Sequence, residues 1–180
     1  MVYCFLAEGF EELEAIAPID MLIRAGIEVV TVGVTGKNVT GSHGITFVAD
    51  ITADEVLLSE KIEAVILPGG MPGTLNLEKS GVVQNAVDYA AENDKYVCAI
   101  CAAPSVLGHK GLLRCKRATA FPGFEKELEG AVISDEYVCT DGRYITARGA
   151  GVAVKFGLAI VSALAGNEKS AEIEKTIQSQ

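Results

Sequence analysis

Short apolar runs of strand length alternate with longer amphipathic segments along this chain, and this alternation restricts the possible folds more than any other feature. Four runs have the length and composition of buried strands, at residues 2–7, 28–34, 64–67 and 96–100. Apolar residues recur at helical spacing in the segments 11–25 and 80–93, and another helix is expected after Ala102. The sequence therefore predicts an α/β fold with a mostly parallel central sheet covered by helices on both faces.

The remaining segments predict smaller elements around this sheet. Two β-hairpins are expected, an irregular one at residues 39–50 and one around an Asp-Gly turn at 137–147. The capping-box pattern at 52–55 predicts a short helix that continues to about Lys61. A further helix is expected over about 151–164, and the polar residues after it are compatible with a final surface helix.

No linker, internal repeat or low-complexity stretch divides the chain. Its 180 residues, 49% of them hydrophobic, are enough for one compact domain with a sizeable core. We therefore expect a single domain over residues 1–180, in which the tail after about 166 is peripheral.

The charge and the apolar pattern exclude several classes of function. The formal net charge is −9, whereas nucleic acids and anionic membranes bind basic patches. Charged residues or glycines interrupt every apolar stretch before it reaches the length of a membrane span. The first residues lack the basic region of a signal peptide. The sequence thus predicts a cytoplasmic protein with neither nucleic acid nor membrane as a partner.

The cysteines and histidines give little support to a disulfide scaffold or a metal site. Five cysteines are scattered along the chain, and this odd number favours free thiols in a reducing compartment. There is one C-x-x-C pair, and the two histidines, His43 and His109, are at no metal-ligand spacing. We expect no metal and no other cofactor.

Three loops that follow predicted strands contain residues suited to chemistry. They are AEGFEELE at 7–14, PGGMPG at 68–73 and CAAP at 101–104. In an open α/β sheet, sites form at the carboxyl ends of the strands. If the three strands are neighbours, an acid, a glycine-rich turn and a thiol meet at one edge of the sheet.

Cys101 is the first candidate for a functional residue. A thiol at the start of a helix lies near the positive end of the helix dipole and near unpaired N–H groups, and both favour the thiolate. Ala102 is small enough for a strained strand-to-helix turn, and Pro104 suits the first helical turn. The alternative is that Cys101 is a small buried hydrophobe. Cys98 lies inside the apolar strand, so we expect it to pack in the core rather than form a redox pair with Cys101.

Glu14 is the second candidate. Glu11, Glu12 and Glu14 lie together at the start of a helix, where carboxylates are stabilised by the helix dipole. This role explains Glu11 and Glu12, whereas Glu14 is bracketed by apolar residues beside the predicted site. A partly buried carboxyl beside a thiol has a raised pKa and can donate a hydrogen bond to the sulfur, so that the two groups share a proton.

Gly69 and Gly70 form the third candidate feature. Glycines allow the backbone to approach a neighbouring group and to direct N–H donors at it, and with the N–H of Ala102 they predict an oxyanion hole opposite Cys101. A glycine-rich turn is also ordinary in α/β folds, so this prediction depends on its neighbours. His43 and His109 are interpreted as surface or capping residues, and no Ser-His-Asp arrangement is recognisable.

Together, GFEELE at 9–14, ILPGG at 66–70, AICAAP at 99–104 and TARGAG at 146–151 resemble the DJ-1/ThiJ/PfpI superfamily over residues 2 to about 166, and its DJ-1 branch most closely. The resemblance implies a flavodoxin-like three-layer sandwich, a homodimer, and a cysteine on a nucleophile elbow. It also implies that Cys101 is the reactive thiol, Glu14 its protonated partner, and Gly70 and Ala102 the backbone donors.

The same resemblance implies several possible functions. The first is a glyoxalase or deglycase activity on small reactive carbonyls, with protection against oxidative or carbonyl stress. The second is a non-catalytic redox sensor in which an oxidant converts Cys101 to a sulfinic acid. A PfpI-type peptidase is less well supported, because those enzymes have a histidine directly after the cysteine and this chain has Ala102.

The sequence departs from the family pattern at two positions. Phe121 is found where DJ-1 proteins commonly have a histidine, so a Cys-His dyad is not expected. His43 is found where an arginine is common near the dimer interface. Arg148 keeps the family residue and is a candidate pocket or interface cation, and Gly69 is expected to line the same pocket.

Overall fold

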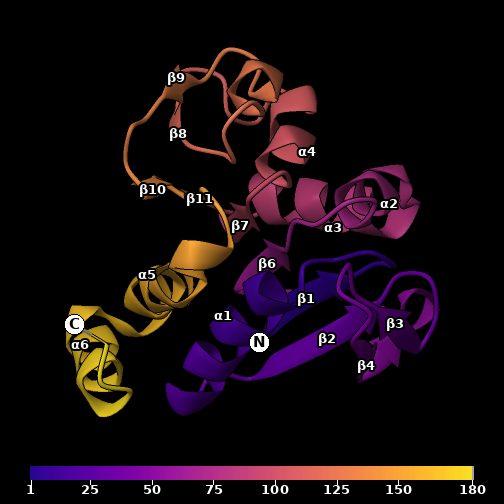
Figure 1. Cartoon of the computed structure of the whole chain (residues 1–180), viewed down its shortest axis with the longest axis horizontal. Coiled ribbons are helices and arrows are strands. Elements are labelled where there is room, and N and C mark those ends of the chain that lie inside the picture. Colours follow the sequence, from indigo (N-terminus) through magenta and orange to yellow (C-terminus); the bar gives the residue numbers. More distant parts are fainter. Residues whose placement is uncertain (180) are drawn as a thin grey trace.

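The computed structural model describes residues 1–179, which form a seven-stranded central sheet with the strand order β10-β11-β7-β6-β1-β2-β5 (Figure 1). Its strands are β1 (Val2–Leu6), β2 (Val29–Gly33), β5 (Ile51–Thr52), β6 (Ala64–Leu67), β7 (Tyr96–Ile100), β10 (Val138–Asp141) and β11 (Tyr144–Ala147). All neighbouring strands are parallel except β10 and β11, which form the predicted antiparallel hairpin. The mostly parallel sheet is confirmed.

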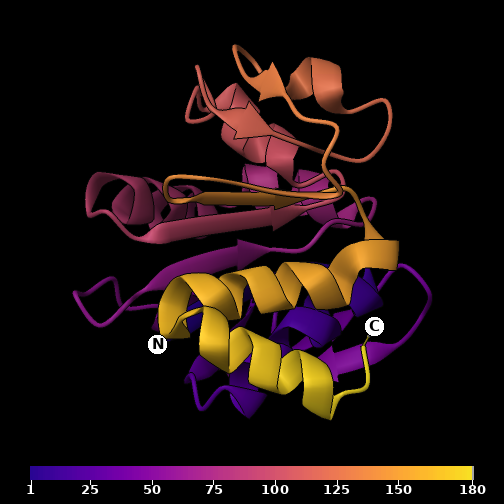
Figure 2. The same ribbon diagram turned by 90° about the vertical axis from the view of Figure 1, so that its left-hand side faces the viewer.

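Helices cover both faces of this sheet. On one face lie α1 (Glu12–Arg24), α5 (Ala153–Ala165) and α6 (Asn167–Thr176), and on the other α2 (Gly73–Lys79), α3 (Gly81–Glu92) and α4 (Pro104–His109). Figures 1 and 2 show α5 and α6 side by side, with α6 on the outside. The order β2-β1-β6-β7-β11 is that of a flavodoxin-like doubly wound sheet, and the predicted three-layer sandwich is confirmed.

The side chains of β1 explain why the central strands are continuously apolar in sequence. Val2, Cys4 and Leu6 pack in the core beneath α1 and α5, whereas Tyr3 and Phe5 pack in the core on the opposite face. Successive side chains of a strand point to opposite faces, and here both faces are buried.

Two small sheets lie outside the central one. β3 (Asn38–Thr40) and β4 (Thr46–Val48) form the hairpin expected at 39–50, and β8 (Arg117–Ala118) pairs with β9 (Val132–Ile133). The β3–β4 hairpin rests on the loop between β1 and α1, because Thr40 O accepts the N–H of Gly9 and Phe10 O accepts the N–H of Ser42. The hairpin therefore lies directly beside the acidic start of α1.

The helix predicted from Thr52 to about Lys61 is wrong. The capping box forms, with Thr52 and Glu55 bonded to each other, but only a 3-10 turn, η1 (Ala53–Glu55), follows. Val56 is already extended with ψ 125°, and Leu57 is 75% exposed, so no apolar face buries this segment. A local cap does not sustain a helix that lacks tertiary packing.

The opposite error occurs at the short helix α2, which was not predicted from the sequence because it starts at Gly73 inside a segment that is typical of a loop. Two other 3-10 turns, η2 (Glu125–Glu127) and η3 (Ala150–Val152), lie beside α4 and before α5. Within residues 1–179, no helix has the length and apolarity needed to cross a membrane.

Candidate active site

The three loops that were predicted to meet do so at the carboxyl ends of adjacent strands. β7, β6 and β1 are neighbours in the sheet, and the strand order reverses between β1 and β6. Glu14 follows β1, Gly69 and Gly70 follow β6, and Cys101 follows β7. This reversal is where doubly wound sheets form their binding crevices.

Cys101 occupies a strained turn between β7 and α4. Its φ of 65° lies in the left-handed region that non-glycine residues rarely adopt. Two hydrogen bonds hold its backbone there: the N–H donates to Ala147 O at 2.8 Å, and the C=O accepts from the N–H of Phe121 at 2.8 Å. The side chain is half-buried, and the N–H groups of Gly70 and Ala102 lie near its sulfur.

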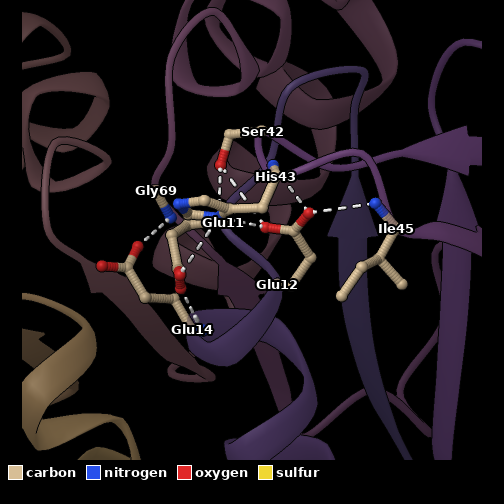
Figure 3. Close-up of polar contacts among 7 residues, drawn as sticks. All are labelled: Glu11, Glu12, Glu14, Ser42, His43, Ile45 and Gly69. Atoms are coloured by element: carbon tan, nitrogen blue, oxygen red, sulfur yellow. Dashed lines mark hydrogen bonds and ion pairs between the residues drawn. The ribbon is translucent and has the colours of Figure 1, made fainter.

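Glu14 is only 1% exposed, yet its carboxyl has few donors. The N–H of Gly69 donates to Oε2 at 3.0 Å, and Figure 3 shows the other oxygen pointing away from Gly69. The carboxyl also faces the Cys101 thiol and the N–H of Ala150. Burial raises the pKa of Glu14 from its ordinary 4.5 to about 7, although these contacts oppose the change.

At Gly69 the backbone passes close to both the Glu14 carboxyl and the Cys101 side chain, and the absence of a side chain there allows these two groups to meet. A Cβ at this position would lie 2.5 Å from Glu14 Oε2 and 2.6 Å from Cys101 Cβ. Gly70 adopts a φ of 92°, which favours glycine and turns its N–H toward the sulfur. Any larger side chain at Gly69 would separate the two groups.

The thiol and the carboxyl form one coupled acid–base unit. Burial and the neighbouring charge of Glu14 raise the pKa of Cys101 to about 12, against the N–H groups of Ala102 and Gly70. Between about pH 7 and pH 12 the pair therefore holds a single proton. When that proton is on Glu14, the carboxyl donates to a thiolate that also accepts two N–H groups.

Cys98 has a different environment, as predicted. It is completely buried in the sheet, where it packs with residues of the core beneath α1 and α5. Burial raises the pKa of its thiol strongly, and nearby Cys4 adds to this. All five cysteines are free thiols.

Glu12 lies in the first turn of α1, where a dipole-stabilised carboxylate was expected, and the structure gives it a second role. Its buried carboxylate also accepts the N–H and the imidazole Nδ1 of His43, each at 2.8 Å (Figure 3). Ser42 Oγ and the N–H of Ile45 approach the same carboxylate at 3.4 Å. The true N-cap is Glu11, whose Oε2 accepts the N–H of Glu14 at 2.7 Å. Glu12 thus fixes the β3–β4 loop to α1.

Among the described residues, this cluster has the side chains that could together ligate a metal ion. The ligand atoms of Glu11, Glu12 and His43 lie within 4.8 Å of one another. The hydrogen bond between Glu12 and His43 already accounts for their approach, and the absence of a metal stays a prediction. The second histidine, His109, lies between the carboxylates of Glu78 and Glu127 and connects α4 to α2 and η2.

A pocket of about 470 Å³ lies beside the Cys101 turn, and two of the predicted pocket residues, Phe121 and Arg148, line it. Gly69 and His43 do not, and His43 lines a different hollow. Gly149 lies in its wall, where an added Cβ would be 3.2 Å from the Phe121 ring and 3.7 Å from Glu14 Oε1. Tyr137 was not identified from the sequence, and its ring lies under the Arg148 guanidinium at 5.1 Å. Its position at the start of a predicted hairpin did not indicate that it would line a pocket.

A doubly wound α/β sandwich that holds a cysteine on a strained turn against a buried carboxyl defines a class of proteins with a thiol at the switch point of the sheet. Residues 1–163 match the sequence profile of the DJ-1/PfpI family, and the chain belongs to this family.

Related proteins agree with this assignment. The chain is 36% identical to protein dj-1beta of Drosophila melanogaster, over 94% of this chain and 92% of that protein. It is 31% identical to the glutathione-independent glyoxalase DJR-1.2 of Caenorhabditis elegans, over 94% and 91% of the two chains. Among solved structures, oxidized DJ-1 of Toxoplasma gondii superposes with a TM-score of 0.94 at 31% identity, covering 98% of this chain and 97% of that one.

Proposed function

We propose that this protein is a cysteine-dependent enzyme that converts small 2-oxoaldehydes into 2-hydroxy acids without an added thiol. The observation that supports it most is the close approach of Cys101 and the buried Glu14 on either side of Gly69, beside the N–H groups of Gly70 and Ala102. A nucleophile, a proton carrier and an oxyanion hole are the parts that this reaction needs. A relative of similar length is named a glutathione-independent glyoxalase.

The reaction begins when the Cys101 thiolate adds to the aldehyde carbon and forms the C–S bond of a hemithioacetal. The N–H groups of Gly70 and Ala102 stabilise its oxyanion. Protonated Glu14 gives its proton to this oxyanion. The resulting carboxylate removes the hydrogen of the same carbon as a proton and returns it to the neighbouring keto carbon, while the hydroxyl proton of the first carbon passes to the keto oxygen. The first carbon is oxidised to a thioester and the second is reduced to an alcohol. Water cleaves the C–S bond, releases the 2-hydroxy acid and regenerates the thiol, so no external oxidant is required.

A deglycase reaction reaches the same hemithioacetal by displacement. The thiolate forms the C–S bond at the carbonyl-derived carbon of a hemiaminal adduct as the C–N bond breaks and the protonated amine leaves. Peptide hydrolysis has less support. It needs a general acid for the leaving amine, which an imidazole beside the thiol usually provides. Here Phe121 and Ala102 lie near Cys101, and neither side chain can donate a proton.

The decisive experiment follows lactate formation from methylglyoxal in a buffer free of other thiols. We expect turnover by the wild type and by Cys98→Ser, the matched control thiol from the same strand. Cys101→Ser should lose at least about a thousandfold of activity, because it removes the nucleophile. Turnover that survives in Cys101→Ser, or none in the wild type, would exclude the proposal.

A second candidate function is redox sensing by Cys101, favoured by the donors around its sulfur. Sulfinate oxygens would accept hydrogen bonds from protonated Glu14 and from the N–H groups of Gly70 and Ala102. Mild peroxide followed by peptide mass spectrometry tests it. Cys101 should oxidise first, and the exposed Cys115 is the internal competitor. Earlier oxidation of Cys115 would contradict the sensor role.

We also propose that the protein is a cytoplasmic homodimer. Free thiols suit a reducing compartment. Exposed Leu13, Ile16 and Ile45 line a hollow of about 300 Å³ beside His43, and a second copy of the chain is a fitting cover for this apolar surface. Light scattering should give the mass of a dimer, and Ile16→Glu should give a monomer. A monomeric wild type would exclude this assembly.

A further inference from the structure

The pocket beside the thiol has a composition that the reaction of a very small aldehyde does not explain. Its volume of about 470 Å³ lies within the range of sites for small organic ligands, far above the size of methylglyoxal. Two aromatic side chains are exposed in it, Phe121 by 47% and Tyr137 by 63%. Exposed aromatic rings around a hollow favour a planar, apolar ligand.

Arg148 is the charged side chain in the wall of this pocket, and its guanidinium is weakly engaged. Nε contacts Thr119 Oγ1 at 3.4 Å, and Nη2 lies 3.8 Å from Asp135, whose side chain is fully exposed. Such an exposed pair contributes little and is easily exchanged for another anion. Since a guanidinium has five N–H donors, Arg148 retains the capacity to bind a carboxylate.

The pocket adjoins the reacting groups, although neither Cys101 nor Glu14 is part of its lining. The N–H of Phe121 donates to the carbonyl of Cys101, so the ring begins one hydrogen bond away from the thiol's backbone. Gly149 and Ala150 belong to the pocket wall and also lie against the Glu14 carboxyl. A molecule with its carbonyl carbon at Cys101 has room for its opposite end in this adjoining pocket.

We infer that this pocket binds a planar, apolar group that carries a carboxylate, and that the substrates are carbonyl compounds with such a group at the end remote from the aldehyde. The Phe121 and Tyr137 rings contact the planar body, and Arg148 binds the carboxylate. The part about substrates rests on the proposed 2-oxoaldehyde activity, whereas binding of the carboxylate does not. Remote contacts of this kind contribute binding energy that the reacting end can use.

A turnover experiment compares three substrates: methylglyoxal, phenylglyoxal and 4-carboxyphenylglyoxal. We expect kcat/KM of the wild type to be about tenfold higher for 4-carboxyphenylglyoxal than for phenylglyoxal, as expected for one charge-assisted pair. Arg148→Met should reduce this ratio to about one, and Arg148→Lys should retain part of it. The matched control is Arg143→Met, because Arg143 also lies over a tyrosine ring, Tyr96 at 4.7 Å, but lines a different hollow.

A binding experiment tests the pocket without chemistry. Cys101→Ser protein is titrated with 4-acetylbenzoate and with its neutral counterpart acetophenone, followed by calorimetry or ligand NMR. We expect 4-acetylbenzoate to bind about tenfold more tightly, and this preference to disappear when Arg148→Met is added. Neither probe has an aldehyde, so the result is independent of turnover and of arginine modification.

The two experiments separate the possible failures. Arg148-dependent binding of 4-acetylbenzoate without turnover of any aldehyde would overturn the proposed activity and leave the carboxylate site in place. Turnover of methylglyoxal with equal use of the two phenyl substrates, and equal binding of the two probes, would overturn the inference alone. A preference for the carboxylate that persists in both Arg148 variants and in Arg143→Met would also overturn the role of Arg148.

Discussion

Glu12 and Glu14 lie two residues apart on α1, both are buried, and their pKa values move in opposite directions. Burial raises the pKa of each carboxyl. At Glu12 the imidazole of His43 and the N–H groups of His43 and Ile45 outweigh burial, so its pKa is lowered. At Glu14 burial is deeper and the charge of Glu11 adds to its effect, so the hydrogen-bond partners do not offset it and the pKa rises to about 7. The balance between burial, neighbouring charge and donors decides whether a buried acid is held as an anion or retains its proton.

The difference follows from what each carboxyl faces. Glu12 points to the β3–β4 hairpin, which offers unpaired N–H groups at its turn. Glu14 points across the sheet edge to Cys101, a thiol that competes for the same proton. One helix turn therefore provides both an anchor for a loop and a carboxyl with a raised pKa beside the thiol.

The largest expected effect is on the pH dependence of the free energy of unfolding. The folded pKa of Glu14 lies above its ordinary value, so its contribution to stability is present below pH 4.5 and is lost as pH rises through about 7. Relative to the wild type, Glu14→Gln should gain up to about 3 kcal/mol in free energy of unfolding between pH 4 and pH 8. Urea unfolding at a series of pH values measures this change.

Glu12→Gln is the matched control and should show the opposite slope. The folded pKa of Glu12 is lowered, so its stabilisation is present above the ordinary pKa and is lost as pH falls. We expect Glu12→Gln to cost roughly 1–3 kcal/mol at pH 7, because the hairpin N–H groups lose an anionic acceptor. Parallel slopes for the two variants would contradict the comparison.

The second test is the reactivity of Cys101 toward iodoacetamide. In the wild type the rate should rise with an apparent pKa of about 7, when the pair loses its first proton. Glu14→Gln has no carboxyl proton to lose, so the step near pH 7 should disappear and the rate should rise only at alkaline pH, where the thiol itself ionises. An unchanged profile in Glu14→Gln, or a similar fall in Glu12→Gln, would mean that the two carboxyls do not have separate roles.

The smallest expected effect concerns the pKa of His43, which the hydrogen bond and charge of Glu12 raise above 6.5. Glu12→Gln should lower it, and Glu14→Gln should leave it nearly unchanged. NMR titration of the imidazole C–H signals measures both. His109, whose pKa is raised by Glu78 and Glu127, provides a reference that neither substitution should move.

The sequence predicted the elements that depend on long apolar patterns and the residues that follow from strand order. Residues 96–100 form β7 as expected, and Glu14 and Cys101 meet because the ends of neighbouring parallel strands share one edge. The contact between Glu12 and His43 could not be predicted from strand order, since His43 belongs to a hairpin whose position against α1 is not encoded by any local pattern. The helix expected after Thr52 failed for the opposite reason, because its local signal was present and its tertiary partner was not.

The position of the thiol–carboxyl pair at the reversal of strand order has a consequence for folding. Glu14 follows β1 and Cys101 follows β7, so the two side chains meet only after β6 has paired with both of these strands. The two halves of the sheet must join before the thiol gains its acid. The native reactivity of Cys101 at neutral pH therefore reports the last pairing step of the sheet. A chain cut between the two halves should regain this reactivity only when the fragments reassociate.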